Sequence, residues 1–379
     1  MRAAVRRLGG WAVRVGVLMA AFLAAQPRNR LTAQDSQFGI RGLGTPGKWE
    51  SVRARSTGGA FAPFDAFSPL IDASLADVRR MSANVTSGTS WRAVDAGGTQ
   101  SALRGTRFPA MVIAGPVTRR IVVGGGFATY LDRSFDVVIH RTDTLRGVPQ
   151  PVTDEITSDG AVSDLRIAVA ARLHNRLALG VGLHRLTGST RVIAKRSFAD
   201  TANYRTSTAR DEVAYGGIGG SASLLLDVTT DLRVAGWFRS DSKLRADIGG
   251  RTVAENDLPL MYGAGVQWRA GTLANVAGTV TWRNWAGAAT VPNAHDTFNW
   301  SVGAEIGPPG SPFRIGLRGG QLPFGIGKTP TEVGYAAGLG RQFSGGRGRL
   351  DIGVERLQRS GTGLTERVWT FLLGLTVRP

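Results

Sequence analysis

The sequence predicts an all-β protein that crosses a membrane as a transmembrane antiparallel up-and-down β-barrel of about fourteen strands. Three observations lead to this fold class. The chain opens with a short export signal, its later segments alternate strictly between apolar and polar residues, and the polar face of those segments is rich in charge and glycine. Each of these observations has a separate physical basis.

The first 33 residues have the order of a secretory signal peptide. Arg2, Arg6, Arg7 and Arg14 precede an apolar run over residues 15–25, which is too short to cross a bilayer as a helix. Small residues allow cleavage after Ala25 or after Ala33, and the Arg6-Arg7 pair leaves twin-arginine export as an alternative. Because no later stretch approaches the length of a membrane helix, a closed barrel is the structure by which the mature chain could span a membrane.

From about residue 84 onward, the alternation has the period of a strand with two different environments. Leu165, Ile167 and Val169 point to one side of such a strand, whereas Arg166 and Arg172 point to the other. The same pattern occurs at residues 258–269, 275–283, 298–306, 350–355 and 369–378. Charged residues in mid-strand are solvated in a water-filled lumen, and glycines leave room there for a plug. The apolar face then meets lipid, with Trp268, Trp282, Trp300 and Trp369 as interfacial anchors.

The connections between strands predict two unlike rims. Short turn signals occur at residues 173–176, 227–231 and 269–271, whereas residues 141–160 and 196–212 form longer polar stretches that we expect to be loops. Short turns at one end and long loops at the other are typical of outer-membrane barrels. We therefore assign residues 84–379 to the barrel.

The segment over residues 34–83 lacks sustained alternation and carries the only resemblance to a known family. Residues 53–61 read RARSTGGAF, and Phe64, Asp65, Phe67 and Leu70 follow. This phrase resembles the opening of the FadL-type family of outer-membrane transporters of hydrophobic compounds such as long-chain fatty acids. The resemblance implies a fourteen-stranded barrel whose lumen is blocked by an N-terminal hatch. Where the family has Asn-Pro-Ala, this chain has Ile71-Asp72-Ala73.

Phe61, Phe64 and Phe67 recur every three residues, so a helical turn would gather them on one face, near Leu70. They are the candidates for a ligand path through the plug. The alternative is that they pack the plug against the barrel wall.

The alternation also predicts which charged residues line the lumen. The candidates are Arg166, Arg172, Arg269, Arg283, Arg314, Arg318, Glu305, Asp351 and Glu355. They could form a lining that favours anionic solutes, including the carboxylate of a fatty acid. Alternatively, they form salt bridges that stiffen the barrel and hold the plug.

The sequence predicts neither an enzyme nor a cofactor or metal site. The chain has no Cys, no GxSxG motif, and four His residues that lie far apart. A hydrolase inside a barrel would need only a Ser and a His on adjacent strands, which the sequence leaves open. The net charge of +18 comes mainly from arginines spread along the whole chain, which favours contact with lipid headgroups over nucleic-acid binding.

We therefore expect a passive channel in the cell outer membrane for hydrophobic small molecules. Its expected partners are outer-membrane lipid, lipopolysaccharide and a hydrophobic or anionic small-molecule ligand. Two alternatives remain: a barrel that does not transport, serving as a scaffold or as a carrier of secreted proteins, and a secreted soluble β protein. The oligomeric state stays open.

Overall fold

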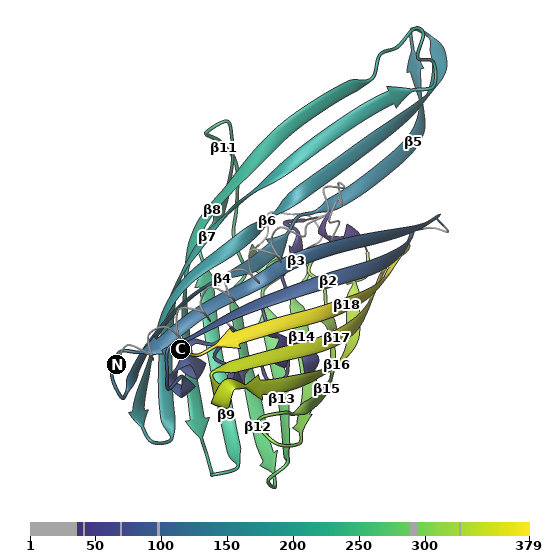
Figure 1. The fold of residues 1–379 in the computed structure, drawn as a ribbon. Helices are drawn as coiled ribbons and strands as arrows, with labels where there is room; N and C mark the ends of the chain where they lie inside the picture. The colour runs from purple at the N-terminus through teal and green to yellow at the C-terminus, as the bar shows by residue number, and fades with distance from the viewer. Residues whose placement is uncertain (1–35, 41, 69, 97–98, 289–293, 326) are drawn as a thin grey trace, which may run out of the picture. The chain divides into compact units, whose positions relative to one another are not determined.

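The computed structural model describes residues 36–379 except residues 41, 69, 97–98, 289–293 and 326, so the expected signal peptide lies outside the described residues. One antiparallel sheet contains the barrel strands and closes on itself, because β18 pairs with β2 from Leu364 opposite Ala96 to Val377 opposite Ala83 (Figure 1). The strands of the wall are β2 (Ser82–Ala96), β3 (Thr99–Pro116), β4 (Ile121–Asp132), β5 (Phe135–Leu145), β6 (Val148–His174), β7 (Leu177–Phe198), β8 (Ser207–Asp227), β9 (Leu232–Asp241), β10 (Leu244–Ile248), β11 (Arg251–Asn256), β12 (Met261–Ala270), β13 (Ala274–Arg283), β14 (Thr297–Ile306), β15 (Phe313–Gln321), β16 (Thr331–Phe343), β17 (Gly348–Gly361) and β18 (Leu364–Val377).

Three of the wall strands are interrupted. β4 and β5 both pair with β6, and β9 and β10 both pair with β8. In the third interrupted strand, β11 pairs with β10 and β12 pairs with β9. With each interrupted strand counted once, the wall has fourteen strands, which confirms the predicted number.

The outer face of the barrel is apolar. Large hydrophobic side chains stand exposed on strand after strand, for example Ile167 at 67%, Leu183 at 74% and Leu317 at 54% relative exposure. Such a continuous apolar belt would be costly in water and is the lipid-facing surface of a membrane barrel. The fold class is therefore the predicted transmembrane barrel. Among the described helices, none is both long enough and apolar enough to cross a membrane.

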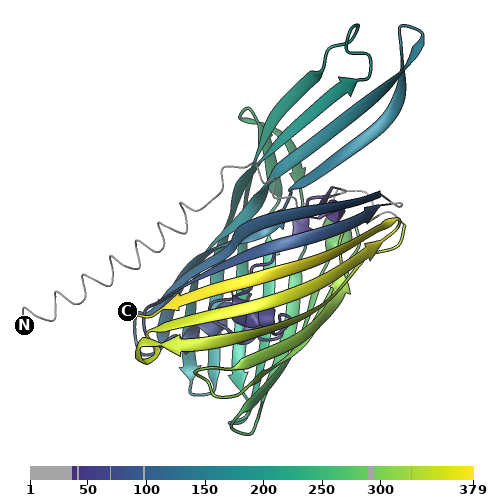
Figure 2. The same ribbon diagram turned by 45° about the vertical axis from the view of Figure 1, so that its right-hand side comes forward.

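The prediction of long polar loops at residues 141–160 and 196–212 is wrong for most of these residues. β5, β6, β7 and β8 continue as paired strands beyond the rim formed by their neighbours (Figures 1 and 2). Polar residues pair well where both faces of a sheet are wet, and Arg196 lies directly opposite Asp154 with Nε 2.7 Å from Oδ1. Polarity therefore marked the end of the membrane belt here, and the strands run on past it.

The residues before β2, here called the luminal segment (residues 36–80), lie inside the barrel (Figure 2). Its elements are η1 (Gln37–Gly39), β1 (Thr45–Pro46), α2 (Val52–Ser56), η2 (Ala62–Phe64) and η3 (Asp72–Asp77). α2 contacts the wall at β15 to β18, whereas η3 contacts β4, β6, β7 and β8. Contacts with opposite sides of the wall place this segment across the lumen. The two remaining short helices, α3 (Trp285–Ala288) and η4 (Ser344–Gly346), lie in connections between wall strands.

Barrel closure is testable at the outward-facing Leu373 of β18, which lies opposite Ser87 of β2. Proline there removes a ladder N–H, so we expect Leu373→Pro to lose the heat-modifiable form, which runs faster on a gel before boiling than after. Leu373→Ala keeps the N–H and should retain the mobility shift. Equal shifts for both variants would contradict the closure seen between β18 and β2.

Candidate functional site in the barrel lumen

α2 is the part of the luminal segment that corresponds to the RARSTGGAF phrase. Ser51 caps the helix, because its side chain accepts a hydrogen bond from the Ala54 N–H. The helix ends before Gly58 and Gly59, whose φ angles of 68° and 99° favour glycine. A side chain at Gly58 would also lie 2.6 Å from the Leu317 carbonyl oxygen. The two glycines thus allow the end of α2 to touch the wall.

Glycines of the wall make the matching space. A Cβ atom at Gly316 would lie 2.0 Å from the Thr57 carbonyl carbon, and one at Gly303 would lie 2.4 Å from the Thr57 oxygen. At the other side, a Cβ atom at Gly180 would lie 2.2 Å from the Ala73 nitrogen. The glycines on the inner face therefore accommodate the backbone of α2 and η3.

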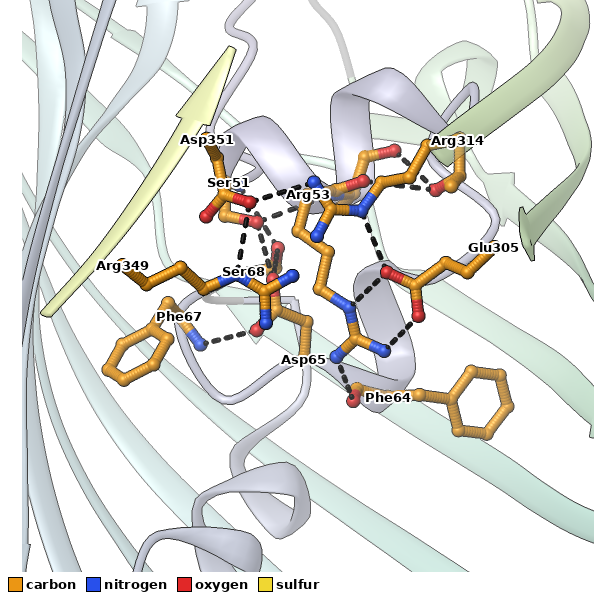
Figure 3. Close-up of polar contacts among 12 residues, drawn as sticks. Ser51, Arg53, Phe64, Asp65, Phe67, Ser68, Glu305, Arg314, Arg349 and Asp351 are labelled. Atoms are coloured by element: carbon orange, nitrogen blue, oxygen red, sulfur yellow. Dashed lines mark hydrogen bonds and ion pairs between the residues drawn. The ribbon is translucent and has the colours of Figure 1, made fainter. Parts of the chain in front are cut away.

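A chain of ion pairs joins α2 to β14, β15 and β17 (Figure 3). Arg53 makes a two-pronged contact with Glu305, with nitrogen–oxygen distances of 2.8 and 2.6 Å. Arg314 then bridges Glu305 at 2.7 Å and Asp351 at 2.8 Å, and Arg349 contacts Asp351 at 3.0 Å. These charges are largely removed from solvent, so each one depends on its partners.

A second group of charges lies beside α2. Arg55 contacts Glu355 at 2.5 Å, and Arg318 contacts the other oxygen of Glu355 at 2.5 Å. Glu332 receives Lys48 from the luminal segment at 2.9 Å and Arg359 from the wall at 2.7 Å. Arg318 also lies 3.5 Å from Glu332, so both carboxylates bind cations from the luminal segment and from the wall.

The turn after η2 is held by its own polar contacts (Figure 3). The Ser51 hydroxyl donates to Asp65, and the Phe67 N–H donates to the same carboxylate at 3.3 Å. The Ser68 hydroxyl donates to Asp65 at 3.3 Å and accepts from the Ser51 N–H at 3.0 Å. These bonds fix α2 and η2 as one unit.

η3 is clamped to the wall through Asp72, the residue that replaces proline in the family phrase. Its carboxylate lies 3.1 Å from Arg166 Nη1 and accepts the Ser221 hydroxyl at 2.6 Å. The Ser223 hydroxyl accepts the backbone N–H groups of Asp72 at 3.0 Å and Ala73 at 2.9 Å. Three wall side chains therefore hold one end of η3.

His184 extends this clamp into the wall. Its Nε2 lies 2.8 Å from Ser221 Oγ and its Nδ1 lies 2.9 Å from Asp164 Oδ2, which also contacts Arg239 at 2.6 Å. Although Asp164, His184 and Ser221 have the order of a hydrolytic triad, the Ser221 hydroxyl donates its one proton to Asp72. The arrangement is thus a polar connection between η3 and three wall strands.

The structure brings most of the predicted lumen-lining charges into these groups. Arg172 also points inward and contacts Asp77 of η3 at 2.7 Å, and Arg283 packs over Trp49 with its guanidinium 5.2 Å from the ring centroid. Arg269 is the exception. It has the inward phase of β12, but the strand ends at Ala270. Its side chain is therefore exposed to solvent at the rim, beside Arg176 and Asp227.

Of the four apolar residues predicted to form a ligand path, one is packed in the interior and three line cavities. Phe61 is fully buried, with the Arg53 guanidinium 5.3 Å from its ring centroid. Phe64 and Phe67 line a cavity of about 540 Å³ that also touches Arg53 and Arg378. Leu70 lines a separate cavity of about 140 Å³ together with Trp49, Leu322 and Arg283.

Sequence reasoning missed the partners in the luminal segment, above all Asp72, Asp77 and Lys48. The one available signal was Asp72, an acidic residue at a position where the family phrase has none. Within the described part of the chain, no three His, Asp or Glu side chains gather in a way that could hold a metal ion.

Glu50 lies just before α2, and its carboxylate is incompletely paired. Burial raises the pKa of its carboxyl above the ordinary value, although Arg55 opposes that rise. Its Oε2 atom is buried and has no hydrogen-bond partner among the described residues.

Comparison with known proteins shows which solved structures share this fold. No protein-family model and no curated protein matches the sequence. Among solved structures, a Pseudomonas aeruginosa FadL homologue is similar with a TM-score of 0.64 at 13% identity, over 88% of this chain and 99% of that one. The CymD monoaromatic hydrocarbon channel is similar with a TM-score of 0.56 at 13% identity, over 90% of this chain and 99% of that one. For the Pseudomonas putida toluene transporter TodX, the TM-score is 0.55 at 11% identity, over 88% of this chain and 98% of that one. The chain has the fold of the FadL-type outer-membrane transporters, as the sequence resemblance predicted.

Steric fit between α2 and the wall is testable at Gly316. Gly316→Ala places a methyl group against the Thr57 backbone and should loosen the luminal segment by about 1–3 kcal/mol. Limited proteolysis of the detergent-purified barrel would show faster cleavage within residues 36–80. Gly278→Ala, where the nearest atom lies 3.6 Å away, is the matched control and should behave like the parent chain.

Glu50 gives a pH prediction. Because its pKa is raised in the folded protein, the folded state binds more protons, and the stability of the luminal segment should fall as pH rises above the ordinary carboxyl pKa. Glu50→Gln should remove that fall. Hydrogen exchange of α2, corrected for intrinsic rates, measures it between acidic and neutral pH. Glu255→Gln, an exposed carboxylate on β11, is the control, and equal pH slopes in all three proteins would refute the assignment.

Proposed function

We propose that the protein is a passive outer-membrane channel for hydrophobic small molecules, with the luminal segment as its movable plug. The observation that carries the proposal is the pair of cavities that touch opposite parts of the luminal segment. One holds Trp49 and Leu70, the other Phe64 and Phe67. A solute crossing the barrel would pass from one to the other only if the residues between them move.

The lining of these cavities favours an amphipathic solute. Apolar side chains would contact its hydrocarbon part, while Arg283 near Trp49 and Arg80 in the cavity of Phe64 offer positive charge to an anionic group. A long-chain fatty acid has both features. The similar structures are described as channels or transporters of toluene and other monoaromatic hydrocarbons, which supports the apolar part of this assignment.

The polar contacts of the plug are of a kind that can be exchanged during movement. α2 and η3 meet the wall through ion pairs and glycine contacts, and water can replace ion pairs when the plug shifts. Among the ion pairs of η3 in the described residues, the one at Asp72 is the most buried. We infer that its release accompanies passage of the solute.

The two alternative functions differ in what they require. A secreted soluble protein would have to expose the apolar outer belt to water, which the exposure of residues such as Leu183 makes unfavourable. A scaffold that does not transport would keep its plug fixed. Plug movement therefore separates the channel from the scaffold.

A disulfide tests plug movement directly, because the chain has no Cys of its own. A Cβ atom at Gly374 of β18 would lie 3.2 Å from Val52 Cβ of α2, a few tenths of an ångström short of the usual disulfide spacing. We expect the oxidised Val52→Cys/Gly374→Cys protein in vesicles to admit a fluorescent fatty acid no faster than empty vesicles. Reduction should restore uptake.

Each single Cys variant, oxidised in the same way, is the matched control and should transport normally. Equal uptake by the locked and the reduced double variant would show that α2 need not move and would remove the plug mechanism. Absence of uptake by the parent chain, for both a fatty acid and toluene, would favour the scaffold.

A further inference from the structure

An arginine on the lipid-facing surface is held between aromatic rings. Tyr335, Arg356 and Trp369 lie opposite one another on β16, β17 and β18, in the outward phase of each strand. Arg356 Nη1 donates to the Tyr335 hydroxyl at 2.9 Å, and its guanidinium lies 5.8 and 5.2 Å from the Tyr335 and Trp369 ring centroids. The rings fix the position of this cation.

A second outward arginine lies close to the first. Arg367 is two residues from Trp369 on β18, which makes it a diagonal neighbour of Arg356 at a typical Cα spacing of roughly 7–8 Å. Within the described residues, neither arginine forms an ion pair with a carboxylate. Two positive charges are thus available on one small area of the outer surface.

An apolar groove begins beside these arginines. It has a volume of about 570 Å³ and includes Arg356, Tyr335 and Trp369 in its lining. One row away, Ala337 lies between Ile315 and Val354, and its short side chain leaves the surface hollow there. The groove is therefore apolar along its length and positive at one end.

The position of the arginines along the strand fits a lipid headgroup. β17 starts at Gly348, which pairs with Val377 near the C-terminus, and ends at Gly361 at the opposite end. Arg356 is nearer to Gly361, on the side where β5 to β8 extend (Figure 1). Long extensions mark the outer side of bacterial barrels, and aromatic rows mark the depth of the headgroups.

We propose that this surface binds a phosphate-bearing lipid of the outer leaflet, with an acyl chain in the groove and the phosphate on Arg356 and Arg367. Guanidinium groups bind phosphate through paired hydrogen bonds, and the adjacent groove supplies a place for hydrocarbon. Continuity of the two surfaces favours a lipid over free phosphate. The site is separate from the plug and does not depend on transport.

Native mass spectrometry of the detergent-purified full chain, titrated with diphosphorylated lipid A, tests the proposal. We expect Arg356→Gln/Arg367→Gln to bind the lipid about tenfold more weakly or worse. The single variants Arg356→Gln and Arg367→Gln are measured as well. Their control is Arg341→Gln, which removes an exposed outward arginine at the other end of β16. A gel mobility shift on boiling verifies that every variant retains its barrel.

The groove is tested separately. Ala337→Leu fills it and should weaken lipid binding, whereas Ala264→Leu on the outer face of β12 should not. Equal losses in the test and control variants would overturn the site, as would equal binding of dephosphorylated lipid. Displacement of the lipid by inorganic phosphate alone, at matched concentration, would indicate a free-phosphate site and overturn the lipid assignment.

Discussion

Closure of the sheet is the constraint on which the rest of the structure depends. Inside a bilayer, every backbone N–H and C=O group must be paired within the protein, and the pairing of β18 with β2 removes the last free edge. Closure with fourteen strands also encloses a space too wide for the wall side chains to fill. The lumen must therefore contain water or another part of the chain, and here the luminal segment occupies it.

The wall and the luminal segment fit because glycine and charge recur together on the inner face. Gly180, Gly303 and Gly316 allow backbone to approach backbone, and the charged residues between them supply directional contacts. Asp72, Arg53 and Arg55 then hold the luminal segment at separate positions around the wall. An apolar inner face of the same shape would bind the segment without fixing its register.

The sequence predicted the features that depend on local periodicity and missed those that depend on closure. Alternation identified the inward phase of Arg166, Arg314 and Glu355, since a strand side chain points to one face or the other whatever its partner is. It could not identify the partners, because Arg55 and Glu355 are 300 residues apart in the chain. The alternation also placed Arg269 in the lumen, although this residue is exposed at the rim. The polar stretches were interpreted as loops, although β5 to β8 continue through them as paired strands. Polarity indicates contact with water and does not show whether the backbone remains paired.

The chemistry of the luminal contacts bears on how firmly the plug is held. A buried ion pair loses hydration energy on forming, so its net contribution is much smaller than its Coulomb attraction. When α2 or η3 moves, water can hydrate both partners, and the difference between the seated and the displaced states stays small. Movement would also have to expose apolar side chains that are now buried, among them Phe61 under the Arg53 guanidinium, Ile71 and Leu75. The polar bonds of the plug can be exchanged for bonds to water, whereas its buried apolar side chains need a replacement contact. A solute that supplies its own apolar surface and charge offers both.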